Sequence, residues 1–122
     1  MGTSSYKDLV VWQKAMVLAR DCYRLTDPFP KSEVFGISSQ IRRAAVSIPC
    51  NIAEGWGREG AKEFSYFLRI AQGSTKELET LLLLANDLYP PQTDMVPRLL
   101  ESIAEISRMI RALNASLKRK AG

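Results

Sequence analysis

The sequence predicts an all-α protein, an antiparallel up-and-down four-helix bundle whose second helix is kinked at Pro49. Four stretches carry apolar residues at alternating three- and four-residue steps, and prolines or glycines separate them. Strand-like alternation is absent from the sequence. A length of 122 residues, 46% of them hydrophobic, fits one domain. We expect a single domain over residues 1–122, with a leader at 1–7 and a basic tail at 118–122.

The first helix is expected to follow Asp8, a good N-cap residue, and to end before the segment 27–30, whose two prolines cannot continue a helix. Its apolar side chains form two neighbouring rows, which widen the surface that it buries. One row is Leu9, Trp12, Met16, Ala19 and Tyr23, and the other is Val11, Ala15, Leu18 and Cys22.

The second helix is expected to start between Ser32 and Ser38 and to run to about Gly55. Proline at position 49 removes the hydrogen bond to the Ala45 carbonyl, but the apolar spacing resumes beyond it, so we expect a kink rather than an end. The apolar stripe of this helix is Ile37, Ile41, Ala44, Ile48 and Ile52. The turn that follows is expected to be made by Gly55, Gly57 and Gly60.

The third helix is expected to run from an N-cap at Gly60, with Glu63 reaching back to the cap, to about Tyr89. It carries two apolar rows, and a helix that is apolar on two faces must be covered on both. The first row suits the core of the bundle. The second row predicts an oligomer interface formed by Phe67, Ile70, Leu81, Leu84 and Leu88.

The fourth helix is expected to start at a cap formed by Thr93 or, better, Asp94, because Asp94 would place Pro97 in the first turn. Its apolar residues step by three and four over three heptads, which is typical of a packing seam. The seam is Val96, Leu99, Ile103, Ile106, Ile110, Leu113 and Leu117.

Composition argues against an enzyme. The sequence has no histidine, which excludes Ser-His and Cys-His catalytic pairs and His-ligated zinc. Cys22 and Cys50 lack metal-ligand spacing, and no group of acids converges, so we expect no metal, no cofactor and no catalytic residue. Few cysteines, no secretory signal and no apolar run of about 20 residues indicate a cytoplasmic protein without a membrane partner.

The net charge of +4 is concentrated near the C-terminus. From Arg98 onward there are six bases and two acids, whereas residues 1–97 hold eleven of each. This asymmetry points to a polyanionic partner, although basic residues also collect at helix C-termini because they complement the helix dipole. The candidate nucleic-acid-binding residues are Arg108, Arg111, Lys118, Arg119 and Lys120, with Arg42 and Arg43 as a second region.

A polar seam runs along the second helix, turned away from its apolar stripe. It is either a solvated face with Glu54 and Arg58 as an i,i+4 ion pair, or a surface that meets another subunit or a phosphate backbone. Its members are Arg43, Ser47, Asn51, Glu54 and Arg58.

The chain resembles the family of four-helix-bundle proteins encoded in intervening sequences of bacterial 23S ribosomal RNA genes. The likeness lies in residues 8–15, 40–58, 62–71 and 73–80. It departs from the family pattern at Cys50, where serine is usual, and at Gly60, where a serine-type cap is common.

This resemblance implies an antiparallel bundle that assembles as a homopentamer and has no known catalytic residues. Related bundles are accessory proteins of diversity-generating retroelements, which bind nucleic acid and a reverse transcriptase. We therefore expect a non-enzymatic oligomer that binds RNA or DNA, with a reverse transcriptase as a further candidate partner. The alternative is a protein–protein interaction scaffold that binds no nucleic acid.

Overall fold

The computed structural model describes residues 4–90 and 93–121. Four helices carry the fold: α1 (Val10–Thr26), α2 (Ile37–Gly57), α3 (Ala61–Leu88) and α4 (Val96–Ala121). Two short 3-10 turns, η1 (Tyr6–Asp8) and η2 (Lys31–Glu33), precede α1 and α2. No strand occurs in the described ranges, so the all-α prediction is confirmed.

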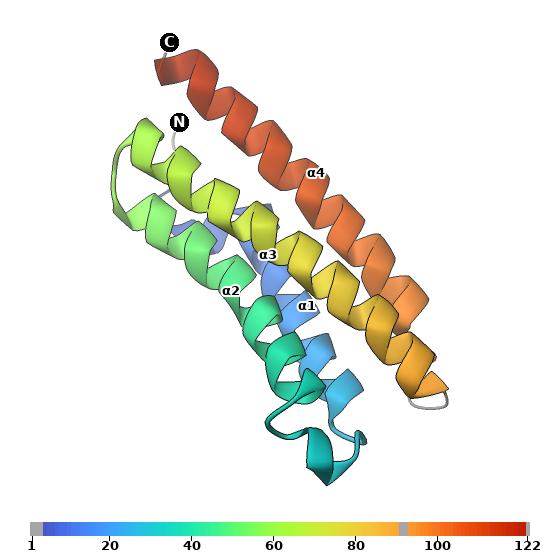
Figure 1. The fold of residues 1–122 in the computed structure, drawn as a ribbon. Coiled ribbons are helices and arrows are strands. Elements are labelled where there is room, and N and C mark those ends of the chain that lie inside the picture. The colour runs from blue at the N-terminus through green and yellow to red at the C-terminus, as the bar shows by residue number, and fades with distance from the viewer. Residues whose placement is uncertain (1–3, 91–92, 122) are drawn as a thin grey trace.

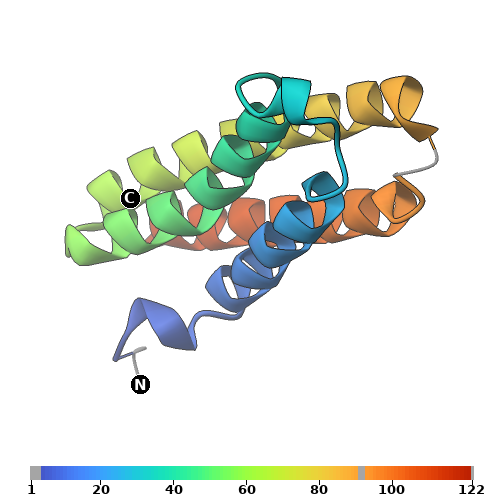
Figure 2. The same ribbon diagram turned by 90° about the horizontal axis from the view of Figure 1, so that it is seen from below.

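Consecutive helices run in alternating directions, as the colour gradient in Figure 1 shows. The view from below in Figure 2 shows the loop that carries η2 joining α1 to α2 at one end of the bundle. One continuous core lies between the four helices, and every predicted apolar stripe contributes to it. Among its fully buried side chains are Leu18, Ile48, Leu78 and Ile106. No described helix is long and apolar enough to cross a membrane.

The start of α1 differs from the prediction. Asp8 is part of η1, and the N-cap of α1 is Leu9, whose side chain makes no capping hydrogen bond. Ser5 caps η1 by accepting from the Lys7 N–H, and the Gln13 amide donates to the Lys7 carbonyl. Residues 5–8 thus turn over the start of α1, with the Tyr6 ring edge-on to Trp12 at 5.3 Å, and Asp8 lies in this turn instead of at the cap.

Helix α2 continues through Pro49 without a break, as predicted, while the kink remains a prediction. Its end was placed wrongly, because Gly55 and Gly57 lie inside the helix. A Cβ at Gly55 would come within 2.8 Å of the Phe64 ring and 2.9 Å of the Phe67 Cβ. Glycine is therefore needed here for the close approach of α3, not for a turn.

The caps of the two long helices were only partly predicted. Gly60 is the N-cap of α3, as expected, but Glu63 approaches Arg58 at 3.9 Å instead of closing a capping box. Helix α4 starts at Val96, with Pro97 in its first turn, so neither Thr93 nor Asp94 stands directly before it. The Thr93 hydroxyl instead donates within the α3–α4 connection, where it lies 2.9 Å from the Asn86 side-chain oxygen and 3.1 Å from the Tyr89 carbonyl.

The predicted seam of α4 is buried along most of its length but not at its C-terminal end. Its first five members are buried, but Leu113 and Leu117 are only half-buried. The basic residues 118–120 belong to the last turns of this helix. The basic tail is therefore a helical extension of the seam-bearing element, and it holds its charges in a fixed arrangement around the helix axis.

Candidate nucleic-acid interface

The C-terminal half of α4 presents its basic residues to solvent. Arg108, Arg111, Lys118, Arg119 and Lys120 are all exposed. None of them forms an ion pair within the described ranges, and no acid follows Glu105 in the sequence. Glu105 itself contacts Lys14 of α1 at 3.3 Å. The predicted basic sector of α4 thus carries charges that form no ion pair in the described residues.

Polar contacts fix the register between α3 and α4. The Ser65 hydroxyl donates to the Asn114 side-chain oxygen at 2.5 Å. Seven residues further along α3, the Gln72 amide donates to the Ser107 carbonyl at 3.0 Å, and the Ser107 hydroxyl donates back to Gln72 at 2.8 Å. Because both helices step by seven residues between these contacts, they lie antiparallel in register along two helical turns.

This register brings basic residues of α3 beside those of α4. Lys62, Arg69 and Lys76 are exposed and spaced by seven residues, so they share one face of α3. Arg69 donates to the Ser65 hydroxyl at 3.1 Å, next to the bond from Ser65 to α4. Counting from the two contacts, Arg69 lies level with Ile110, one residue before Arg111, and Lys62 lies level with Leu117, one residue before Lys118. We call Lys62, Arg69, Arg108, Arg111 and Lys118 the basic face.

The contribution of α3 to this surface was not predicted from the sequence. The seven-residue spacing of Lys62, Arg69 and Lys76 was visible, but their position next to α4 depends on the polar contacts between the helices. Tyr66 was also missed as an exposed aromatic: its side chain is 52% exposed, and the Arg69 guanidinium lies 5.9 Å from its ring centre. An exposed ring beside cationic groups can stack on a nucleobase.

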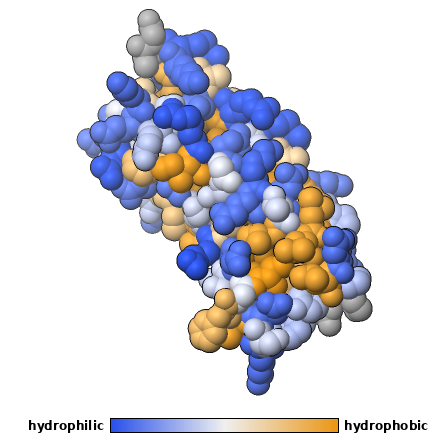
Figure 3. Space-filling model, viewed as in Figure 1, coloured by the Kyte–Doolittle hydropathy of each residue, from blue (hydrophilic) through white to orange (hydrophobic). Residues whose placement is uncertain are grey.

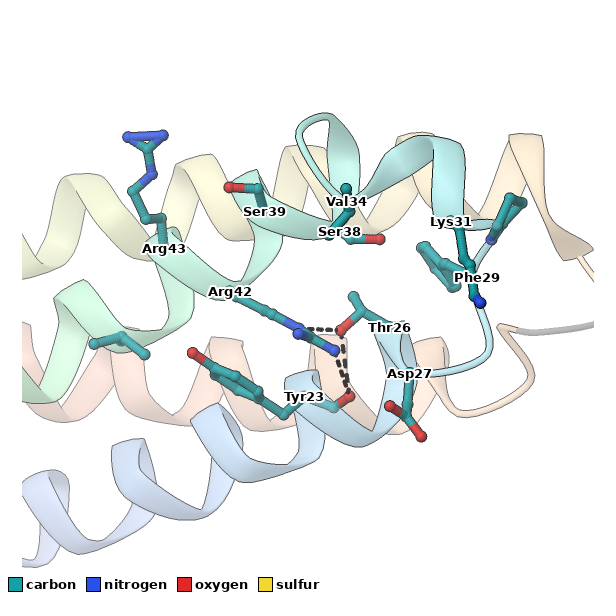
Figure 4. Close-up of a pocket in the computed structure, with 12 residues that line it drawn as sticks. Tyr23, Thr26, Asp27, Phe29, Lys31, Val34, Ser38, Ser39, Arg42 and Arg43 are labelled. Carbon is teal, nitrogen blue, oxygen red and sulfur yellow. Dashed lines mark hydrogen bonds between the residues drawn. The ribbon is translucent and has the colours of Figure 1, made fainter.

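The two residues of the second predicted region, Arg42 and Arg43, have different surroundings in the structure. Arg42 is half-buried: its Nε donates to the Thr26 hydroxyl at 2.8 Å, and a terminal nitrogen donates to the Tyr23 carbonyl at 3.5 Å. Its guanidinium also lies 4.6 Å from the Tyr23 ring centre. Figure 4 shows this arrangement at the end of α1, with Arg43 pointing away from it. The structure therefore gives Arg42 a role inside the subunit and leaves Arg43 exposed.

Arg42 lines a pocket of about 460 Å³ between the end of α1 and the start of α2. The pocket also holds the hydroxyls of Ser38 and Ser39 and the side chain of Lys31 (Figure 4). Asp27 lies on the same wall, so the charge is mixed. The basic groups do not converge on one point in this view, in contrast to the aligned basic residues of α3 and α4.

The polar seam of α2 is largely used within the subunit. The Ser47 and Ser74 hydroxyls lie 2.8 Å apart and join α2 to α3. Asn51 donates to the carbonyl and the hydroxyl of Ser47. Glu54 and Arg58 form the expected i,i+4 ion pair at 2.8 Å. Four of the five residues in the seam therefore have partners in their own chain, and only Arg43 forms no ion pair or side-chain hydrogen bond in the described part.

The predicted oligomer row of α3 is mostly exposed, with one correction. Ile70 is 37% exposed, Leu84 47% and Leu88 52%, and Phe67 is half-buried. Leu81, however, is buried in the core: it lies seven residues after Ser74, on the side of α3 where Ser74 contacts Ser47 of α2. Figure 3 shows apolar surface, in orange, over the C-terminal half of α3.

The titratable groups of the described residues show few shifted pKa values. Burial, with a smaller effect from the Asp21 charge, raises the pKa of the Cys22 thiol to about 12, whereas Cys50 is exposed. The Tyr89 hydroxyl donates to Glu33, which lowers the pKa of Glu33 and raises that of Tyr89.

In residues 4–90 and 93–121, no three His, Cys, Asp or Glu side chains are grouped to hold a metal ion.

Comparison with known proteins identifies the fold and the family. A crystal structure of a protein with unknown function, from the S23 ribosomal protein family of Bacteroides thetaiotaomicron, is similar to this structure with a TM-score of 0.75 and 23% sequence identity. The match covers 86% of this chain and 98% of that one. No functionally curated protein matches the chain. The family model described as 23S rRNA-intervening sequence protein matches residues 7–112, and the chain belongs to this family.

Proposed function

We propose that this protein is a non-enzymatic, oligomeric nucleic-acid-binding protein that contacts RNA through the basic face of α3 and α4. The observation that carries the proposal is the alignment of five exposed cationic side chains from two helices, none of them in an ion pair within the described ranges. Phosphate groups are the polyanion that such a surface fits, since they are spaced regularly along a backbone.

The geometry favours contacts with phosphates over recognition of bases. The lysines and arginines of the basic face lie exposed on the outer sides of two neighbouring helices, where they can reach the phosphates of a nucleic-acid backbone. Binding of this kind releases counterions, so the affinity falls steeply with salt concentration and depends weakly on sequence. Tyr66, beside Arg69, supplies one ring for stacking on an unpaired base.

The experiment compares two double variants that remove the same formal charge. Arg108→Gln with Arg111→Gln removes two arginines of the basic face, while Arg24→Gln with Arg58→Gln removes two that are paired to Asp21 and Glu54. We expect the first pair to weaken binding to a structured RNA. The slope of log K against log salt should also become less negative by about 2 for each subunit that contacts the RNA. The second pair should leave that slope nearly unchanged.

Equal effects of the two double variants would show that only net charge matters and would contradict a defined interface. No binding of RNA or DNA by the wild-type protein at low salt would favour the scaffold alternative. A reverse transcriptase partner stays a prediction, which co-purification with that enzyme would test.

The oligomer in this proposal is a homopentamer in the cytoplasm. Its support is the exposed apolar row of α3 together with the family resemblance. We expect a native mass of about five times 13.7 kDa by light scattering. A monomer at micromolar concentrations would contradict it.

A further inference from the structure

An outward row on α3 has features that the isolated subunit does not explain. We call Ile70, Gly73, Glu77, Leu84 and Leu88 the outer row, because they lie within about 60° of one another on a helix that turns about 100° per residue. All five residues are exposed. The row therefore places three aliphatic side chains in water along a helix whose opposite side is buried.

Gly73 is the least expected member of the outer row. It lies in the middle of a 28-residue helix, where glycine is less favourable than alanine. A Cβ at this position would meet nothing within 4 Å, so no neighbour in the same chain requires its absence. Gly55, by contrast, is pressed against Phe64 and Phe67. A mid-helix glycine with open space above it is explained when a second backbone approaches the helix there.

A complementary surface lies between α1 and α2. A groove of about 640 Å³ runs between these helices, and its lining is mainly apolar. Its walls include Trp12, Met16, Ala19, Pro49, Cys50 and Ala53. The small side chains of Ala19 and Ala53 leave room for a ridge to enter, and Arg20 lines the groove with an exposed side chain.

We propose that the outer row of α3 docks into the α1–α2 groove of a second copy of this chain. A single helix is convex, and it fits a groove better than it fits an identical helix. Glu77 in the row and Arg20 in the groove are both exposed and carry opposite charges, and neither forms an ion pair in the described part of the chain. Pairing of two outer rows would instead bring the like charges of two Glu77 residues together.

Two different surfaces on one subunit give a head-to-tail interface. Such an interface does not stop at a dimer: it repeats from copy to copy and closes into a ring when the rotation allows. The inference rests on the oligomer in the proposed function and names the surfaces that form it. It does not depend on RNA binding.

The chain offers a direct test, because Cys50 is an exposed thiol in the groove. Leu84→Cys adds a second thiol in the outer row. Under mild oxidation of the purified oligomer with air, we expect Cys50 of one copy to bond to the new cysteine of the next, which gives a ladder of cross-linked chains on a denaturing gel. Cys22 does not contribute, since it is buried and its pKa is raised.

Leu83→Cys is the matched control: Leu83 is 50% exposed, next in sequence, and lies about 100° around the helix from Leu84. It should give no ladder. The ladder from Leu84→Cys should disappear when Cys50→Ser is added. Cross-links that persist in that double variant would show pairing of two α3 rows and would overturn the inference.

Gly73→Ala gives an independent readout. We expect the variant to resist thermal unfolding at least as well as the wild type, because alanine favours helix, but to associate at least tenfold more weakly. An unchanged association constant would overturn the inference. An intact oligomer without the Cys50 cross-link would also overturn it while leaving the proposed oligomer standing, whereas a monomeric wild type would contradict both.

Discussion

Arg42 of α2 and Arg58 at the C-cap of that helix look like the arginines of α4 in the sequence, but the structure uses them differently. Arg42 donates to Thr26 and Tyr23 at the end of α1, and Arg58 pairs with Glu54. Arg108 and Arg111 of α4 are exposed and form no ion pair in the described ranges. The charge of an arginine is available to a ligand only where its surroundings supply no partner. For Arg58 the partner is four residues away, whereas for Arg42 the partners are distant in the sequence.

The two sets of arginines are expected to affect different properties: the stability of the subunit and its binding to a polyanion. Arg42 joins α2 to the end of α1, so its loss is expected to change folding. Arginines of α4 lie outside the core contacts, so their loss is expected to change association with a polyanion.

Removal of the α3 part of the basic face should weaken RNA binding about as much as removal of the α4 part. For Lys62→Gln with Arg69→Gln, the loss of two phosphate contacts corresponds to about a hundredfold lower affinity at about 50 mM salt. Filter binding over a salt series measures it. If this variant bound RNA with full affinity while the α4 variant did not, the interface would be confined to α4.

Arg42→Gln should lower the free energy of unfolding by about 1–2 kcal/mol, because it removes charge-assisted hydrogen bonds and a cation at the C-terminus of α1. Arg43→Gln, one residue away and exposed, should change it by no more than about 0.5 kcal/mol. Urea denaturation of both variants checks the contrast. Equal stabilities would show that the bonds at Thr26 and Tyr23 contribute nothing.

The hydroxyl pair between α2 and α3 should be a modest contact within the subunit. A double-mutant cycle with Ser47→Ala and Ser74→Ala is expected to give a coupling free energy of about 0.5–1 kcal/mol. If the seam instead served RNA binding, the variants would alter affinity for RNA and leave the coupling near zero.

The Glu33–Tyr89 contact should produce the smallest effect, visible only at the extremes of pH. The lowered pKa of Glu33 means that its contribution is present above its unfolded value of 4.5 and is lost as the pH falls through the folded value. The raised pKa of Tyr89 means that its contribution is present below 10.0 and is lost as the pH rises through the folded value. The stability difference between wild type and Tyr89→Phe should therefore be greatest at neutral pH and shrink at both ends, as measured by thermal unfolding.

The helices were predictable because their spacing of apolar residues reports burial directly, as Ile41 and Ile106 illustrate. Helix caps were less predictable, because a cap depends on which groups lie nearby. Ser5 and Gln13 form hydrogen bonds with Lys7 in the turn before α1, and Asp8 lies in that turn instead of at the N-cap. Gly55 was read as a turn residue, but its lack of a side chain serves the contact with Phe64.

The exposed charges of α4 followed from the position of its apolar seam. The contribution of Arg69 could not be predicted in the same way, because it depends on the register set by Ser65 with Asn114 and by Gln72 with Ser107. The separation of Arg42 from Arg43 had a similar origin: the partners of Arg42 lie 16 and 19 residues earlier in the chain.

The contact at Gly55 also bears on the order in which the chain folds. Gly55 touches Phe64 across a short turn, so α2 and α3 can pack at this end after closing a loop of only a few residues. Closure of so short a loop costs little entropy and precedes contacts between distant segments. We expect the α2–α3 hairpin to be structured in the folding transition state, with α1 and α4 added afterwards, so that Phe64→Leu slows refolding more than it speeds unfolding.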